Sequence, residues 1–160
     1  MVKNNFKNIG ILGGSFDPPH KGHLYISKQS LKRLKLKKII WAITKRNPLK
    51  KKSFFSLNMR KKLCQKMIKG NKKIKLRYYE DKLKSKKSII LIKFLKKHNK
   101  YKIFFIIGSD NLINFHKWKS YKELLKMSVL VVFSRKGFDT KAKKSVIMRH
   151  PESKNIKFFK

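Results

Sequence analysis

The sequence predicts an α/β protein built on a doubly wound parallel sheet, and three observations support this fold class. Short apolar runs typical of strands alternate along the chain with segments that have helical apolar spacing. The strand-like runs are continuously apolar, as in parallel sheets that helices cover on both faces. Segments with unusual residues start directly after predicted strands, which is where ligands bind in open parallel sheets.

Two strands and one helix are predicted in the first part of the chain. Residues 9–12 form an apolar run that stops at Gly13 and Gly14, which indicates a buried strand followed by a tight turn. Residues 22–34 have the apolar spacing of an amphipathic helix. Residues 39–43 form a second apolar run and are predicted to be the next buried strand.

A basic loop, two helices and a strand are predicted in the middle of the chain. Pro48 interrupts the basic segment after the second strand, and Ser56 is placed to cap the helix that comes next. Residues 74–78 alternate between apolar and polar side chains, which predicts a third strand. A helix over 88–97 is expected to start with Ser88 as its cap.

The last third of the chain carries the strongest strand signal. Residues 101–107 are continuously apolar and rich in aromatic and β-branched side chains, and the run stops at Gly108. Residues 121–127 are predicted to form a helix, residues 129–133 a fifth strand and residues 156–159 a sixth.

Length and composition predict one cytoplasmic domain over residues 1–160. Hydrophobic residues make up 41% of the chain, but no apolar run reaches the roughly 20 residues that cross a bilayer. The single cysteine, Cys64, allows neither a disulfide within the chain nor a cysteine-based metal site, and it is expected to fill a small space in the core.

The net charge of +38, from 45 Lys and Arg against 7 Asp and Glu, would by itself indicate a nucleic-acid partner. The basic residues are almost all lysine, however, and they are spread over every segment instead of gathering in one. A drift of the whole composition explains that pattern, so no specific nucleic-acid or membrane partner is expected. The charge should still concentrate anionic substrates near the protein in a salt-dependent way.

The segment from Gly13 to His23 has the composition of a phosphate-binding loop. Its glycines permit backbone angles closed to other residues, and Gly22 lies near the start of a predicted helix, where unpaired N–H groups attract anions. His20 and His23 are three residues apart, which places their rings on one side of a helix start. Both rings can therefore contact one phosphate.

Other interpretations of this segment find less support. The spacings of the Walker loop and of the dinucleotide fingerprint are both missing from it. A zinc site at His20 and His23 would need further ligands, and Asp17 is the only local candidate. A purely structural role for the two histidines stays open.

The same segment resembles the GSFDPxHxGH signature of the nucleotidyltransferases related to class I tRNA synthetases. That resemblance implies a Rossmann-like nucleotidyltransferase fold, with His20 and His23 as catalytic residues that bind the phosphates of ATP. The ATP-binding residues implied in this segment are Gly13, Gly14, Ser15, Phe16, His20, Gly22 and His23.

A second motif narrows the family. The stretch from Phe105 to Trp118 resembles the FIIGxDxLxxFxxW motif of bacterial nicotinate-nucleotide adenylyltransferases, and Trp41 to Lys50 resembles the loop that follows their second strand. The match runs in register from about residue 9 to residue 137. It implies transfer of the adenylyl group of ATP to nicotinate mononucleotide, giving deamido-NAD and pyrophosphate in NAD biosynthesis.

The resemblance also implies roles for residues of the later segments. Gly108 and Asp110 would bind the adenosine of ATP, although Asp110 can alternatively cap a helix over 110–115. Trp118 would lie near the nicotinate ring, with a core aromatic as the alternative, and Arg135 would bind phosphate, with a solvated surface charge as the alternative. Asn47 and Ser88 complete the expected mononucleotide-binding set.

Two departures from the family pattern bear on these roles. In the family, an SYT-type turn comes before the helix that leads to the fourth strand. The corresponding residues here are Lys86–Ile90, where only Ser88 keeps a hydroxyl. The family's closing ISSTxIR motif is expected just after Lys160, where this sequence stops. We therefore expect a truncated gene or gene model, a fold that lacks its C-terminal helical part, and uncertain activity of the 160 residues.

The expected reaction needs no nucleophile, base and acid set, because the attacking phosphate is already an anion near neutral pH. Positioning and charge stabilisation would come from the two histidines, main-chain N–H groups, Arg135 and a Mg²⁺ ion that bridges phosphates, with no metal ligand assigned to the protein. The alternatives are another phosphate acceptor, such as phosphopantetheine or nicotinamide mononucleotide, or an inactive truncated basic nucleotide-binding module.

Overall fold

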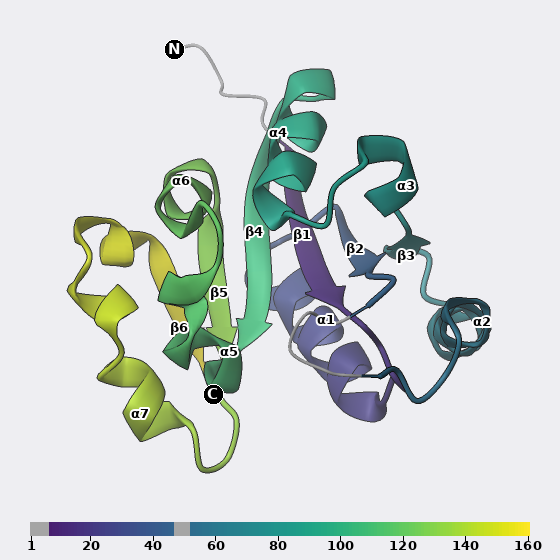
Figure 1. Cartoon of the computed structure of the whole chain (residues 1–160), viewed down its shortest axis with the longest axis horizontal. Helices are drawn as coiled ribbons and strands as arrows, with labels where there is room; N and C mark the ends of the chain where they lie inside the picture. The colour runs from purple at the N-terminus through teal and green to yellow at the C-terminus, as the bar shows by residue number, and fades with distance from the viewer. Residues whose placement is uncertain (1–6, 47–51) are drawn as a thin grey trace. The chain divides into compact units, whose positions relative to one another are not determined.

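The computed structural model describes residues 7–46 and 52–160, which fall into two compact units. We call Lys7–Lys86 the N-terminal unit and Lys87–Lys160 the C-terminal unit. Each unit contains three parallel strands with helices packed against them (Figure 1). The expectation of one domain over residues 1–160 stays a prediction.

In the described part of the N-terminal unit, strands and helices alternate. In chain order they are β1 (Lys7–Gly14), α1 (Lys21–Arg33), β2 (Lys38–Ile43), α2 (Leu57–Ile68), β3 (Ile74–Arg77) and α3 (Glu80–Leu83). Strand β2 pairs in parallel with β1 on one side and β3 on the other, and its residues 39–43 are all buried. Helix α1 packs against β1 and β2, whereas α2 packs against β3.

Helix α2 starts where the sequence predicts it, because Ser56 accepts a hydrogen bond from the main-chain N–H of Met59 at 3.2 Å. Its buried side is formed by Arg60 and Cys64, one helical turn apart. Cys64 is 0% exposed, which confirms its predicted place in the core. The burial of Arg60 is not predicted by the sequence.

The C-terminal unit follows the same parallel arrangement around a different central strand. Its elements are α4 (Ser88–His98), β4 (Tyr101–Gly108), α5 (Ser109–Ile113), η1 (Phe115–Lys117), α6 (Tyr121–Met127), β5 (Val129–Phe133), α7 (Asp139–Lys143), η2 (Val146–Arg149), η3 (Pro151–Asn155) and β6 (Ile156–Phe159). Strand β5 pairs in parallel with β4 and with β6. The predicted bounds of α6, β5 and β6 are confirmed.

Several predicted details are wrong. Strand β1 runs through Gly13 and Gly14 instead of ending before them, because they pair in register with Ala42 and Ile43 of β2. They therefore make no turn. Ser88 is the first residue of α4, and Lys87 occupies the capping position. The sequence also misses α3, α7, η2 and η3, which span five residues or fewer and carry too little apolar periodicity to be recognised.

All seven carboxylates of the chain, despite the great excess of lysine, hold a specific partner in the fold. Within residues 7–46 and 52–160, two of them form ion pairs, Glu123 with Lys93 and Asp110 with Arg135. The remaining five accept hydrogen bonds from main-chain N–H groups, hydroxyls or an amide; they are Asp17, Glu80, Asp81, Asp139 and Glu152. The rare acidic residues thus fasten loops and helix ends.

Among the helices of the described ranges, not one combines the length and the apolar character needed to cross a bilayer.

Candidate functional site

The segment Gly13–His23, which we call the histidine loop, runs from the last two residues of β1 to the first turn of α1 and brings its two histidines together. His20 lies just before the first residue of α1 with an extended backbone, and its main-chain N–H donates to Nδ1 of His23 at 3.1 Å. The two ring centroids are 3.9 Å apart. The prediction that both rings share one side of the helix start is therefore confirmed. Because Nδ1 of His23 accepts a hydrogen bond, the neutral form of the ring carries its own proton on Nε2.

Gly22 is required next to these rings for a steric reason. A Cβ atom at this position would lie 2.9 Å from Nδ1 of His20. A contact this short would displace the His20 ring, so the absence of a side chain at Gly22 leaves room for that ring.

Phe16, and not a glycine, carries the unusual backbone conformation of the histidine loop. Its φ is 48°, in the left-handed region that β-carbon-bearing residues seldom adopt. The side chain is 1% exposed, stacks on Trp41 with ring centroids 4.8 Å apart, and lies 4.8 Å from the ring of His23. Burial between these two rings offsets the backbone strain and places the aromatic face beside the histidine.

A buried hydrogen-bond relay connects β2 to the start of α1. Nε1 of Trp41 donates to Oγ of Ser27 at 2.8 Å, and the same hydroxyl donates to the main-chain carbonyl of His23 at 2.8 Å. Trp41 and Ser27 are both fully buried. This relay was not predicted from the sequence, although a serine on the inner side of an amphipathic helix is a signal for it.

The segment after β2 lies beside the histidine loop within the N-terminal unit. The main-chain N–H of Thr44 donates to the carbonyl of Gly14 at 3.0 Å. Arg60 donates to carbonyls of both segments, at Ser15 and Thr44, and also to Lys45. Asn47, predicted to bind the mononucleotide, lies outside the described residues.

Arg60 was not among the predicted site residues, although one compositional signal points to it. Only six of the 45 basic residues are arginine, so each arginine is a candidate for a position that uses the planar fork of donors that lysine lacks. Its charge also acts on the neighbouring thiol. Burial raises the pKa of Cys64 to about 12, and the opposing effect of the Arg60 cation is smaller. Cys64 is therefore a neutral thiol at physiological pH.

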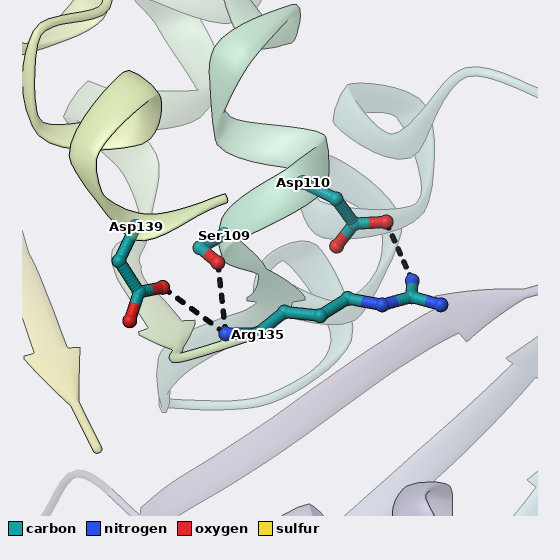
Figure 2. Close-up of polar contacts among 4 residues, drawn as sticks. All are labelled: Ser109, Asp110, Arg135 and Asp139. Atoms are coloured by element: carbon teal, nitrogen blue, oxygen red, sulfur yellow. Dashed lines mark hydrogen bonds and ion pairs between the residues drawn. The ribbon is translucent and has the colours of Figure 1, made fainter. Parts of the chain in front are cut away.

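In the C-terminal unit, the predicted residues Gly108, Asp110 and Arg135 are brought together. Nη1 of Arg135 donates to Oδ2 of Asp110 at 2.7 Å (Figure 2). A Cβ atom on Gly108 would lie 2.4 Å from Oδ1 of Asp110, so only glycine leaves room for this carboxylate. Oδ1 is itself buried and has no hydrogen-bond partner among the described residues. Asp110 lies in the first turn of α5 with Gly108 as the cap, so the alternative that Asp110 caps this helix is wrong.

The backbone of Arg135 is held by two further side chains. Its main-chain N–H donates to Oγ of Ser109 at 2.9 Å and to Oδ1 of Asp139 at 3.1 Å (Figure 2). Ser134 donates its hydroxyl to the other oxygen of Asp139. The pKa of Asp139 lies below its ordinary value of 3.8, with the hydrogen bond from Ser134 as the largest cause. The carboxylate therefore keeps its charge and fixes the turn that presents Arg135, whose side chain is 62% exposed.

Trp118 and Ser88 are placed by the same unit. Trp118 is half-buried and packs against Phe115 at a centroid distance of 5.0 Å and edge-on against Phe105 at 6.2 Å. One side of the indole therefore belongs to the core, while the rest stays accessible. Ser88 is half-buried at the first turn of α4.

Comparison with known proteins gives consistent matches over nearly the whole chain. A family described as cytidylyltransferase-like matches residues 11–157. A probable nicotinate-nucleotide adenylyltransferase of Pelagibacter ubique is 51% identical over 150 residues, which are 94% of this chain and 83% of the relative. The corresponding protein of a Nitratiruptor species is 37% identical over 90% of this chain and 82% of its own length.

Solved structures show the same fold. The Plasmodium falciparum nicotinic acid mononucleotide adenylyltransferase complexed with NaAD has a TM-score of 0.73 and 22% sequence identity, over 96% of this chain and 73% of that one. The same enzyme complexed with APC has a TM-score of 0.72. At this level of identity the likeness establishes a shared fold, and it confirms the predicted Rossmann-like class.

Proposed function

This chain belongs to the nicotinate-nucleotide adenylyltransferases of the cytidylyltransferase-like family, and from that membership we propose its reaction. It transfers the adenylyl group of ATP to nicotinate mononucleotide, giving deamido-NAD and releasing pyrophosphate. The observation that carries this proposal is the pair of rings of His20 and His23, 3.9 Å apart at the start of α1. Such a pair next to the N–H groups of a helix start suits the phosphates of ATP.

On the ATP side, the proposal assigns the phosphates to the histidine loop and the adenosine to Gly108 and Asp110. Oδ1 of Asp110 is buried and lacks a partner among the described residues, so it can accept a ribose hydroxyl without giving up the ion pair made by Oδ2. The unpartnered oxygen supports the assignment, because a bond from the ribose would compensate the cost of burying it.

On the acceptor side, Arg135 binds the phosphate of the mononucleotide and Trp118 lies against the nicotinate ring. The exposed guanidinium of Arg135 forms an ion pair with Asp110 through one nitrogen atom, and this pair orients its remaining donors. Ser88 and Asn47 are proposed as the remaining contacts of the mononucleotide, Asn47 lying outside the described residues.

The chemistry rests on positioning and charge. The phosphate of the mononucleotide attacks the α-phosphorus of ATP in line, and pyrophosphate leaves. No side chain has to take a proton from this nucleophile, since it is an anion near neutral pH. The histidines and Arg135 neutralise charge that develops on the phosphate oxygens.

A magnesium ion belongs to the proposal as a companion of ATP. No group of three or more potential metal ligands occurs among the described residues, so the protein offers no built metal site there. Mg²⁺ commonly binds through substrate phosphates, and when bound it supplies additional charge neutralisation. We also propose that the enzyme works in the cytoplasm and that no specific nucleic acid is a partner.

The test is pyrophosphate release from ATP with nicotinate mononucleotide, by the wild type and by His23→Ala. Losing one such donor typically costs on the order of 3 kcal/mol in the transition state, or about 100-fold in turnover. His98→Ala serves as the control, because His98 is an exposed residue at the end of α4. Unchanged turnover by His23→Ala would refute the assignment of His23 to adenylyl transfer.

The same assay decides between acceptors. Nicotinate mononucleotide, nicotinamide mononucleotide and phosphopantetheine are offered one at a time with ATP. The proposal requires the first to be the preferred acceptor by kcat/KM. Binding of ATP without pyrophosphate release with any of them would instead identify an inactive nucleotide-binding protein.

A further inference from the structure

We propose that Arg60 is a positioning residue for adenylyl transfer, which locks the histidine loop to the segment after β2 and thereby fixes where His20 and His23 meet the phosphates. The inference rests on the proposed function. It concerns a residue of α2 that belongs to none of the sequence motifs and is 1% exposed.

The guanidinium of Arg60 holds four main-chain carbonyls from three segments. Nη1 donates to Ser15 at 2.6 Å and to Thr44 at 2.8 Å, and Nη2 donates to Lys45 at 2.7 Å. Nε donates to Phe55 at 3.1 Å, just before α2 begins. One nitrogen atom, Nη1, therefore bridges the two segments that follow β1 and β2.

These bonds account for the presence of a buried cation. Arginine stays charged at any physiological pH, and a buried charge is costly unless it is paired or fully hydrogen-bonded. The two ion pairs found among the described residues involve other side chains. Carbonyl dipoles therefore solvate the charge of Arg60, and each carbonyl that moves away weakens that solvation. The arrangement resists displacement of either segment.

A second lock acts on the histidine loop from the same side. The carboxylate of Asp17 accepts the main-chain N–H groups of Phe54 at 2.6 Å and Phe55 at 2.8 Å. Phe55 in turn offers its carbonyl to Arg60. These contacts link Asp17 to Phe55, Phe55 to Arg60 and Arg60 to Ser15. They therefore start and end in the histidine loop, at the residues on either side of Phe16. This closure holds the residue with the strained backbone and, through its ring, His23.

Lysine cannot replace Arg60 in this role. The four carbonyls are reached by three different nitrogen atoms, whereas lysine has three donors on one nitrogen. Arg60→Lys keeps the charge and most of the apolar stem, so it tests geometry alone. Arg60→Met removes the charge as well. Arg77→Lys is the matched control, because Arg77 is exposed at the end of β3 and its one hydrogen bond within the described ranges goes to the carbonyl of the adjacent Leu76.

The first measurement is amide hydrogen exchange of a peptide that covers residues 13–23 in the full chain. We expect exchange to speed up at least about ten-fold in Arg60→Lys and to stay unchanged in Arg77→Lys, because local opening is governed by the contacts that a segment loses. The second measurement is steady-state kinetics per folded molecule. Because small misplacements of reacting groups can cost on the order of 100-fold in rate, kcat should fall by about 10- to 100-fold, and KM for ATP should rise.

A role in stability alone gives a different result. It would lower the fraction of folded enzyme but leave kcat per folded molecule and KM for ATP at their wild-type values. Unchanged exchange in residues 13–23, or faster exchange with an unchanged KM for ATP, would overturn the proposal. Absence of pyrophosphate release by the wild type would refute the proposed reaction instead, and the exchange comparison would still decide the locking role.

One measurement needs no variant and remains decisive if the substituted chains do not fold. In the wild type, the Nε–H of Arg60 should exchange with solvent at least about 100-fold more slowly than that of Arg77, as expected for a buried hydrogen-bonded group. Equal rates for the two arginines would contradict the lock.

Discussion

Ser27→Ala tests whether the relay from Trp41 to His23 supports the fold as the geometry requires. The substitution removes the hydroxyl that accepts from Nε1 of Trp41 and donates to the carbonyl of His23, both at 2.8 Å. Because Trp41 is fully buried, its N–H is then left without a partner in an apolar place.

The cost can be worked out from these contacts. An unsatisfied buried donor costs about 1–3 kcal/mol, and the lost bond to His23 adds about 1 kcal/mol. Alanine returns about 0.5 kcal/mol through its better helix propensity. The net loss in the free energy of unfolding is about 1.5–3.5 kcal/mol, or about 3–14 °C in the melting temperature of a chain of this size.

Urea unfolding followed by far-UV circular dichroism measures this loss. Ser30→Ala is the matched control, because Ser30 is equally buried on α1 but its hydroxyl has no hydrogen-bond partner among the described residues. Ser30→Ala should therefore be neutral or stabilising. In a Trp41→Phe background, which lacks the donor, Ser27→Ala should cost about 1–2 kcal/mol less than in the wild type. Equal costs in the two backgrounds, within about 0.3 kcal/mol, would refute the reasoning.

Two further substitutions test the C-terminal unit. Gly108→Ala places a Cβ against Oδ1 of Asp110 and must turn that carboxylate away, so we expect KM for ATP to rise about ten-fold. The free energy of unfolding should change by less than about 1 kcal/mol, because it depends little on exposed ion pairs. Steady-state kinetics at varied ATP give the answer, and an unaltered KM would show that Asp110 does not bind ATP. Asp139→Asn should lower stability at pH 7, because the pKa of this carboxyl lies below 3.8 in the folded state and its charge stabilises the fold above that value. That contribution is lost as the pH falls through the still lower folded pKa, so the urea midpoints of variant and wild type should converge in acid; a gap that is constant with pH would contradict the role of Ser134 in holding this charge.

The parallel architecture could be predicted from the sequence because it follows from local patterns. Buried strands are continuous apolar runs, and the run over 129–133 has the bounds of β5. The pair of histidines could be placed as well, since a spacing of three residues at a helix start fixes the side on which both rings lie.

What could not be predicted depends on contacts between distant segments. A buried arginine on an amphipathic helix is indistinguishable by pattern from a solvated one, because three of the four carbonyls that accept from Arg60 belong to residues 15, 16 and 45 positions away. The glycines of the histidine loop were expected to carry its unusual angles, but pairing with β2 keeps Gly13 and Gly14 extended and shifts the strain to Phe16. Packing against Trp41, which no local rule describes, makes that shift possible.

The placement of the two tryptophans gives the molecule one natural fluorescent reporter in each compact unit. Trp41 is sealed against Phe16 in the N-terminal unit, whereas Trp118 is partly open to solvent in the C-terminal unit. Their emission should therefore differ in wavelength, the sealed indole emitting further to the blue. The unfolding of each unit can thus be followed by the fluorescence of its own tryptophan. No added dye is needed to test whether the two units unfold in a single transition.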